Sequence, residues 1–371
     1  MFLFIDKTIV GKKLTPDEVF FFSDIASAYR RGCCHLSGNL ESLRSLYENL
    51  GEPAKGIYKL VMDQYAESKS IMEAINKVFV LTCKTSKDNI KQNLPPFLQH
   101  KGKVQLISIK KALRWNWQIP CCLLAENLND CNFYKLVARA KSPKGICVNL
   151  HFEHGGGSTI ANVLEKCVLQ DKVPTLCIID SDYKYGKTRQ FPQIKKGNTL
   201  IKVKEAEKKL TSSKYPPHKI IPLNVHEVEN LIPLSIFSQL KEKYPAMADG
   251  VTMLTRLQKI RKGSPIFYYD IKNGISGIMG DDPKSIYWKG ISEELIDRET
   301  SHKNGCRKRM ANSISFPTVS SHSRLLCSAN LIIQQQLENK GLQIDRYLNS
   351  NWENIGNLVT AWGCANPPQY A

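Results

Sequence analysis

Two aspartates, two positions apart, follow a wholly apolar run in the middle of the chain, Leu176-Cys177-Ile178-Ile179-Asp180-Ser181-Asp182. A run without polar alternation is typical of a strand buried on both faces of a parallel α/β sheet. Side chains i and i+2 of an extended chain point the same way, so Asp180 and Asp182 are expected to project together. Such a pair suits a hard cation, Mg²⁺ or Mn²⁺. The competing interpretation is a helix cap beside a solvated carboxylate.

A second apolar run, Ile119 to Ala125, also ends in acid, at Glu126. Parallel strands leave a sheet at one edge, so Glu126 is expected at the edge that carries Asp180 and Asp182. Three carboxylates there would form a Mg²⁺ cradle with positions left for water and a phosphate oxygen. A lone Glu in this position is more often a cap or a surface residue. Its coincidence with the two aspartates favours the metal site.

The elements that must position these carboxylates alternate between strand and helix. Apolar runs and helical stripes predict the order strand, helix, strand, helix, strand from residue 119 onward. This order predicts an α/β fold, a parallel sheet with helices on both faces, over about residues 116–240. Within it, Ile146 to Phe152 is predicted as a half-buried strand.

The flanking regions are predicted to be mainly helical. Residues 1–115 begin with a strand, then a helix whose cap and first turn are Thr15 to Glu18, and include a helix over residues 71–80. Residues 241–371 form a mixed, mainly helical accessory region with terminal helices over residues 329–340 and 352–362.

Charge and cysteine usage limit the environment of the chain. Its formal net charge is +18 over 371 residues, which favours nucleic acid as a partner over simple solubility charge, a membrane surface or an acidic protein. No apolar stretch has the length of a membrane span. The twelve cysteines form no C-x-x-C pair and are scattered, which indicates a reducing, cytoplasmic location.

Four motifs resemble those of Toprim domains, and most closely the Toprim-like nucleases of bacterial anti-phage defence. They are the strand-Glu start with an aromatic pair, a glycine turn, the D-x-D and a late H-E-x-E-N, here Glu126 to Tyr134, Gly155-Gly156-Gly157-Ser158, Asp180-Ser181-Asp182 and His226-Glu227-Val228-Glu229-Asn230. The resemblance covers about residues 119–234. Asn127 replaces the family's usual glycine, and asparagine also accepts a left-handed backbone.

The resemblance implies a role for each matching residue. Asp180 and Asp182 would be the main Mg²⁺ ligands, and Glu126 a ligand or the base that activates water. Glu229 would complete a second metal site, whereas Glu227 would point elsewhere on its helix. Asp130 either supports the metal ligands from behind or is the N-cap of its own helix. His226 either binds phosphate or donates a proton, or it has a cap or core role.

Backbone and basic groups could hold the nucleic acid. Gly156, Gly157 and Ser158 offer N–H groups to a phosphate, with a tight strand–helix turn as the equal alternative. Lys184, Lys187 and Arg189 follow the aspartates on a loop that could contact the nucleic-acid backbone, with a solvated loop as the alternative. Trp115 and Trp117 could stack on bases, although packing is favoured for at least one. Gly186-Lys187-Thr188 lacks the first glycine of a P-loop, so the chain offers no ATPase motif.

These patterns together predict a Mg²⁺-dependent Toprim-like endonuclease that cleaves DNA or RNA, including tRNA, as a defence effector. By analogy with the family, a sensor ATPase would act in trans, and the terminal regions would supply regulation, homo-oligomer contacts or substrate grip. The alternative is a non-catalytic nucleic-acid-binding or scaffold protein with a Toprim-derived fold, which Asn127 and the basicity suit. Primase-like nucleotidyl transfer would use the same metal site.

Overall fold

The computed structural model describes residues 1–83, 94, 98, 103–186, 197–212, 214–260, 264–276, 278, 280–300, 316–320 and 324–368. The chain folds into two compact units. The first comprises Met1–Cys177, Val203–Ile221 and Glu353–Ala371, and the second comprises Ile178–Lys202 and Pro222–Trp352. These units divide the chain at other places than the boundaries predicted near residues 115 and 240.

A four-stranded parallel sheet forms at the start of the first unit. Its order is β2-β1-β3-β4, with β1 Phe2–Ile5, β2 His35–Gly38, β3 Val78–Thr82 and β4 Val104–Ser108. The strand predicted at the N-terminus is confirmed as β1. The helix predicted over residues 71–80 is wrong in its second half, which is β3. Short apolar runs do not distinguish a buried strand from a buried helix, so the predicted mainly helical region contains a complete sheet.

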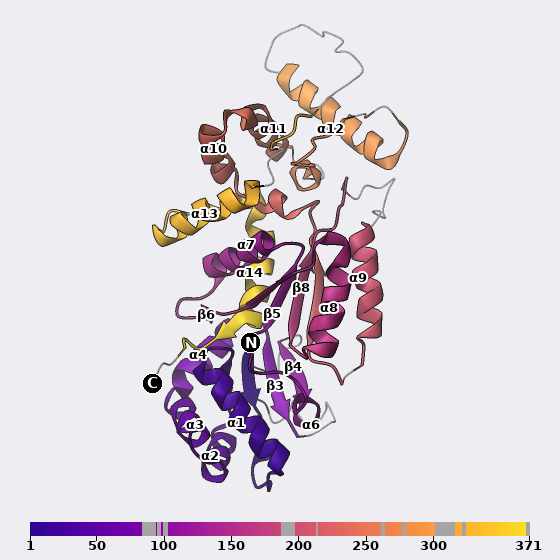
Figure 1. The fold of residues 1–371 in the computed structure, drawn as a ribbon. Helices are drawn as coiled ribbons and strands as arrows, with labels where there is room; N and C mark the ends of the chain where they lie inside the picture. The colour runs from indigo at the N-terminus through magenta and orange to yellow at the C-terminus, as the bar shows by residue number, and fades with distance from the viewer. Residues whose placement is uncertain are drawn as a thin grey trace. The chain divides into compact units, whose positions relative to one another are not determined.

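Helices pack beside this sheet. Helix α1 begins at Pro16 with the predicted cap, because the Thr15 hydroxyl accepts from the N–H of Glu18 and the Glu18 carboxylate accepts from the N–H of Thr15. Helix α3 contacts both α1 and α2, and the three helices lie together in Figure 1. The helices of this segment are α1 Pro16–Arg30, α2 Leu40–Asn49, α3 Ala54–Asp63, α4 Tyr65–Ala74 and α6 Ile109–Ala112.

A second four-stranded parallel sheet follows, in the order β7-β5-β8-β9. The strands are β5 Cys122–Ala125, β7 His151–His154, β8 Thr175–Ile179 and β9 His218–Pro222. The predicted α/β fold with a parallel sheet is therefore confirmed. Every residue of β5 and β8 is buried, as their unbroken apolar runs predict. The predicted strand from Ile146 to Phe152 is divided between β7 and a separate two-residue strand, β6.

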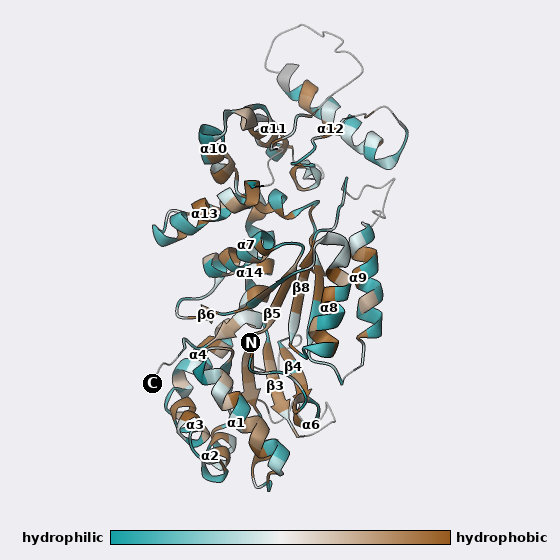
Figure 2. Cartoon of the chain, viewed as in Figure 1, coloured by the Kyte–Doolittle hydropathy of each residue, from teal (hydrophilic) through white to brown (hydrophobic). Residues whose placement is uncertain are grey.

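The crossover segments of this sheet are helical. They are α7 Leu128–Lys141, α8 Ile160–Glu165, which continues as a π-helical turn over Lys166–Gln170, and α9 Asn198–Lys209. The chain returns to the first unit near its end, where β10 Cys364–Ala365 pairs antiparallel with β6 Cys147–Val148. In Figure 2 the central strands are brown and helices such as α8 and α9 carry teal, polar faces.

The second unit is mainly helical among its described residues, as predicted for the C-terminal region. Helix α10 contacts both α11 and α13. The helices are α10 Leu234–Lys243, α11 Ala248–Gln258, α12 Pro283–Thr300, α13 Leu325–Glu338 and α14 Asn349–Gly363, the last of which continues into the first unit. The two predicted terminal helices are thus present as α13 and α14.

Two further features concern the environment of the chain. Within the described ranges, no helix is long and apolar enough to cross a membrane. The cysteines of the described residues are all free thiols, and most are buried. A buried thiol behaves as a small apolar residue, as the scattered cysteine positions predict.

Candidate functional site

The predicted acidic residues follow the strands on either side of a topological switch point. The chain moves from β5 to β7 on one side and to β8 on the other, so the order reverses between β5 and β8, which pair in parallel. Ligands of open α/β sheets bind outside the carboxyl ends of the strands at such a point. Glu126 follows β5 and belongs to the first unit, whereas Asp180 and Asp182 follow β8 and belong to the second.

Asp182 has a left-handed backbone, with φ of 56°. Its N–H donates to the carbonyl of His226 at 3.1 Å, and the preceding Ser181 hydroxyl donates to the carbonyl of Val225. A Cβ atom added to Gly197 would lie 2.2 Å from Oδ2 of Asp182, so a larger residue there would displace the Asp182 side chain. Because β8 ends at Ile179 and Asp182 is left-handed, the extended-chain spacing used to place the two carboxylates together does not hold through Asp182. The side chain of Asp182 is nevertheless exposed and accessible to a ligand.

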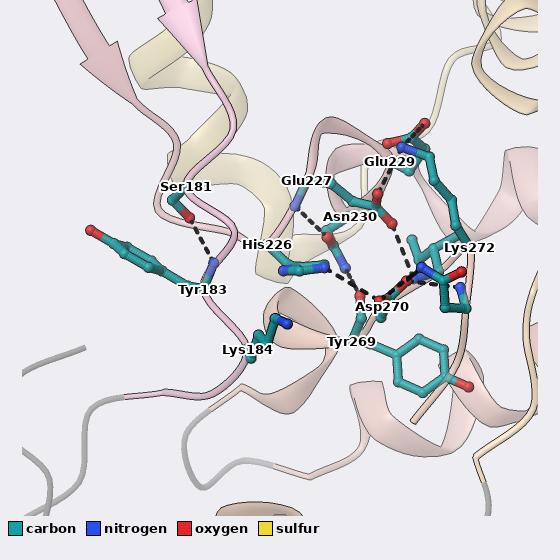
Figure 3. A network of polar contacts seen from close by, with 12 residues as sticks. Ser181, Tyr183, Lys184, His226, Glu227, Glu229, Asn230, Tyr269, Asp270 and Lys272 are labelled. Carbon is teal, nitrogen blue, oxygen red and sulfur yellow. Dashed lines mark hydrogen bonds and ion pairs between the residues drawn. The ribbon is translucent and has the colours of Figure 1, made fainter. Parts of the chain in front are cut away.

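His226 is buried beside two acidic groups (Figure 3). Its Nε2 lies 3.7 Å from Oδ2 of Asp270, an ion-pair distance rather than a hydrogen bond. Burial lowers the pKa of His226, but Asp270, Glu227 and Asp182 outweigh it and raise that pKa above its ordinary value. Its Nδ1 is buried and has no hydrogen-bond partner among the described residues. His226 therefore has one buried ring nitrogen that is unpaired within the described part of the chain, and a charge state set by its neighbours.

Asp270 is held as an anion in a turn. Its Oδ1 accepts a hydrogen bond from the N–H of Asn273 at 2.8 Å, and the N–H of Gly274 donates to its carbonyl at 2.8 Å. Burial raises the pKa of Asp270, but the contacts with His226 and Asn273 outweigh it and bring that pKa to about 2. The negative charge facing His226 is therefore permanent at neutral pH.

Glu227 and Glu229 share one cation, Lys272. Nζ of Lys272 lies 2.8 Å from Oε2 of Glu227 and 3.0 Å from Oε1 of Glu229 (Figure 3). Both carboxylates are buried. Burial lowers the pKa of Lys272, but the two glutamates outweigh it and raise that pKa, so the ammonium group stays charged. Burial and the charge of Glu229 raise the pKa of Glu227.

The two glutamates converge because Glu227 precedes the short helix that contains Glu229. Glu227 is extended, with φ of −144° and ψ of 167°, and the 3₁₀ helix begins after it, over Val228–Leu231. The expectation that Glu227 points away from Glu229 assumed one continuous helix and is wrong. The other oxygen of Glu227, Oε1, accepts from the N–H of Ile271 at 3.1 Å.

Asn230 fixes this segment by three hydrogen bonds. Its Nδ2 donates to the carbonyls of Ile266 and Tyr269, each at 2.9 Å, and its Oδ1 accepts from the N–H of Glu227 at 2.9 Å. Its amide group supplies both the two N–H donors and the carbonyl acceptor that these contacts need. Asn230, the last residue of the His-Glu-x-Glu-Asn motif, therefore has a structural role, because it joins this segment to the backbone of Ile266 and Tyr269.

Sequence reasoning missed Asp270 and Lys272, which lie in the region where the patterns weaken. The available signal is Asn273-Gly274, a turn dipeptide that follows them directly. Gly274 has φ of 68°, and a Cβ there would lie 2.4 Å from the carbonyl oxygen of Phe316. The turn could be predicted from sequence, but its contact with Glu227 and Glu229 could not.

In the first unit, Asn127 and Asp130 form the N-terminal cap of α7. The Asn127 side chain accepts from the N–H groups of Asn129 and Asp130, and Asp130 Oδ2 accepts from the N–H of Asn127 at 2.9 Å. Asn127 has φ of −145°, so the left-handed turn expected for this position is wrong. Asp130 is therefore not the N-cap that was one of its two predicted roles; it is the third residue of α7 and completes a capping box whose N-cap is Asn127.

The glycine triplet forms a tight turn at the end of β7. The N–H of Gly155 donates to the carbonyl of Ala125 at 2.8 Å, and that of Gly156 donates to the carbonyl of Glu126 at 3.1 Å. Gly156 and Gly157 are left-handed, and Ser158 is exposed. The N–H of Gly156 is therefore occupied by the backbone, which favours the turn over a phosphate cradle at this residue.

Of the predicted basic contacts, only Lys184 is described. Its side chain is exposed, and its carbonyl accepts from Nε1 of Trp288 at 2.8 Å, which ties the loop to α12. Lys187 and Arg189 lie outside the described residues.

The acidic residues offer the type of donor atom that a divalent metal ion prefers, but they do not form a complete set of metal ligands. Among the described residues, no group of three or more His, Cys, Asp and Glu side chains could hold a metal ion. Asp180 and Asp182 supply the hard oxygen donors that Mg²⁺ prefers, and Asp182 is exposed. Glu229 fits less well, because its Oε1 is paired with Lys272. Mg²⁺ is commonly held by one or two carboxylates together with substrate phosphates, so the donor set meets this minimum.

No family model, curated protein or solved structure matches this chain.

Proposed function

We propose that the chain is a Mg²⁺-dependent, Toprim-like endonuclease. The observation that carries the proposal is the position of the acidic residues. Glu126 and Asp180 directly follow the two strands that flank the switch point of a parallel sheet. This edge is where open α/β sheets bind ligands, and phosphodiester hydrolysis needs carboxylates that hold a divalent ion.

Asp180 and Asp182, both in the second unit, are the proposed metal donors. A Mg²⁺ ion held there would polarise the phosphodiester and lower the pKa of an attacking water. The carbonyl of His226 holds the N–H of Asp182 and so helps to fix the left-handed backbone that exposes this carboxylate. Glu229 keeps Lys272 in place by their ion pair, in contrast to the second-metal role that the resemblance implies.

Basic side chains would bind the substrate backbone. Lys184 is exposed two residues beyond Asp182. Ammonium groups position phosphates without reading sequence. The net charge of +18 supports a polyanionic substrate, DNA or RNA. A cytoplasmic defence effector that associates with copies of itself and with a sensor ATPase remains part of this proposal, by analogy with the family.

The test is digestion of single-stranded DNA, duplex DNA, RNA and tRNA by the purified chain in Mg²⁺, Mn²⁺ or EDTA. We expect cleavage of at least one substrate with metal and none in EDTA. Asp180→Asn should lower the rate by about 10²-fold or more, because it removes a charged metal ligand. Asp63→Asn, at an exposed carboxylate on α3, is the matched control and should cleave normally. Cleavage by Asp180→Asn at the wild-type rate would refute the assigned role.

A non-catalytic nucleic-acid-binding protein is the second candidate. It is favoured by the ion pairs that tie Glu227 and Glu229 to Lys272, since they give the acidic motif a structural use. Under this alternative the chain binds nucleic acid equally in EDTA and in Mg²⁺, and no substrate is shortened at any metal concentration.

A further inference from the structure

A cavity of about 350 Å³ lies in the first unit, away from the acidic residues of the proposed catalytic edge. Lys172 in its wall precedes β8, and Tyr215 and Pro216 precede β9. The cavity is therefore at the amino ends of these strands. Asp180 follows the carboxyl end of β8, a strand of five residues, which is roughly 17 Å long. The proposed function makes no use of this cavity.

The rim of the cavity is strongly basic. Its basic lining residues come from three separate segments and are Lys110, Lys111, Arg114, Lys172 and Lys214. Among the described residues that line the cavity, none is acidic. Asp171, the chain neighbour of Lys172, is paired with Lys166 at 3.3 Å and so does not neutralise the rim. Like charges repel when they gather in one place, so an anion bound among them would be stabilised.

The floor of the cavity is apolar and partly aromatic. The lining residues of this kind are Trp115, Val168, Leu169, Tyr215 and Pro216. The ammonium group of Lys214 lies 5.0 Å from the centroid of the Tyr215 ring, a cation–π distance. Aromatic floors beside basic groups accept flat bases and their phosphates together. The volume is at the small end of ligand pockets, roughly 300–1,000 Å³, which suits one nucleotide unit.

Hydrogen bonds to backbone carbonyls join the three segments that carry the basic groups. Nε1 of Trp115 donates to the carbonyl of Lys214 at 3.2 Å, and the N–H of Asn116 donates to the carbonyl of Lys172 at 2.9 Å. Lys172 is left-handed, with φ of 56°, a conformation that costs free energy in any residue but glycine. A lysine at that position keeps a cation on the rim despite the cost.

We propose that this cavity binds a nucleotide unit, with its phosphates among the basic side chains and its base on the aromatic floor. The unit could come from a free nucleotide or from a nucleic-acid strand, and the two sources share this chemistry. The proposal is independent of the nuclease proposal because binding here needs no metal and no acidic residue.

The test is calorimetric titration of the full chain in EDTA with three probes: ATP, a short single-stranded oligonucleotide and inorganic pyrophosphate. We expect ATP, the oligonucleotide or both to bind with affinity at least about tenfold above that of pyrophosphate. If ATP binds more tightly than the oligonucleotide, the natural ligand is a free nucleotide. If the oligonucleotide binds more tightly, the ligand is a nucleic-acid strand. Pyrophosphate has no base, so if it binds as tightly as ATP and the oligonucleotide, the proposed contact of a base with the aromatic floor is wrong.

Two variants and a matched control separate the cavity from general charge. Lys110→Gln with Arg114→Gln removes two exposed rim charges and should weaken binding about tenfold or more. Lys172→Gly removes a third charge while suiting the left-handed backbone, so it should weaken binding without loss of thermal stability. Arg44→Gln with Lys59→Gln removes equal charge from exposed positions on α2 and α3 and should bind as the wild type does.

Equal loss of affinity in the rim pair and in the control pair, or no binding of either nucleotide probe, would overturn the proposal. Asp180→Asn should bind all probes normally even if it no longer cleaves. A failed nuclease assay and a failed binding assay are thus distinguishable.

Discussion

Two buried carboxylates, Glu227 and Glu229, depend on the single ammonium group of Lys272. A buried charge is costly unless it is paired, and removing one partner costs more than the pair itself contributes. Glu227 also accepts from the N–H of Ile271, whereas Oε2 of Glu229 has no hydrogen-bond partner in the described part of the chain. Of these three residues, Lys272 is therefore the one whose loss leaves the most buried charge uncompensated.

Lys272→Met should destabilise the protein by about 2 kcal/mol, below the usual cost of breaking a buried pair because the lysine side chain is half exposed. Urea denaturation at pH 7 measures the free energy of unfolding. Lys289→Met, at an exposed lysine of α12, is the control and should change that free energy by less than about 0.5 kcal/mol. Adding Glu227→Gln and Glu229→Gln to Lys272→Met should restore part of the loss. Equal stability of the two lysine variants would contradict this account.

All four residues of strand β2 are buried, and the first of them is a histidine, His35. The ring of His35 is stacked on that of Phe2, with centroids 4.8 Å apart, and its Nε2 lies 3.0 Å from Oγ of Ser68. Burial disfavours the charged imidazole and lowers the pKa of His35 to about 4. The element therefore tolerates histidine only in its neutral form.

This burial predicts acid lability of the folded chain. Unfolded His35 takes up a proton below about pH 6.5, whereas folded His35 stays neutral down to about pH 4. The stabilisation is thus fully present above the unfolded pKa and is lost as the pH falls across this interval, by at most about 3 kcal/mol. Chemical denaturation from pH 7 to 4 should show a smaller loss in His35→Gln than in the wild type. His154→Gln, at an exposed histidine of β7, should follow the wild type, and identical curves for all three would refute the assignment.

Each compact unit is assembled from separate stretches of chain. The first unit joins Met1–Cys177 with Val203–Ile221 and Glu353–Ala371. Strand β10, near the C-terminus, pairs with β6. The ring of Trp362, in α14, packs on that of Phe79, with their centroids 5.2 Å apart. Neither unit can therefore be excised as one continuous segment. The positive charge of +18 is likewise a property of the whole chain rather than of one motif.

This charge should make nucleic-acid binding depend steeply on salt. Each phosphate contact lowers the logarithm of the binding constant by roughly 0.7–0.9 per decade of salt, because counterions are released. Fluorescence anisotropy with a labelled oligonucleotide in EDTA, from 50 to 300 mM KCl, should give a slope steeper than about −3. An affinity that does not change with salt would show that the basic surface does not bind the nucleic-acid backbone.

The sequence alone determined the features that rest on local chemistry. Unbroken apolar runs predicted β5 and β8, the residues Thr15 to Glu18 predicted the start of α1, and the acidic residues were assigned to strand ends. The parallel α/β fold followed from the order of these elements. Each signal lies within a few neighbouring residues, where backbone geometry and burial leave few choices.

Only the tertiary structure decided which partners these residues meet. It paired Glu227 and Glu229 with Lys272, some forty residues later, and held Asp182 in a left-handed backbone against His226. It also assembled the N-terminal sheet from the four short strands β1 to β4. It also gathered the basic rim of the cavity from three segments. Contacts between distant segments depend on how whole elements pack together, and no local pattern encodes that choice.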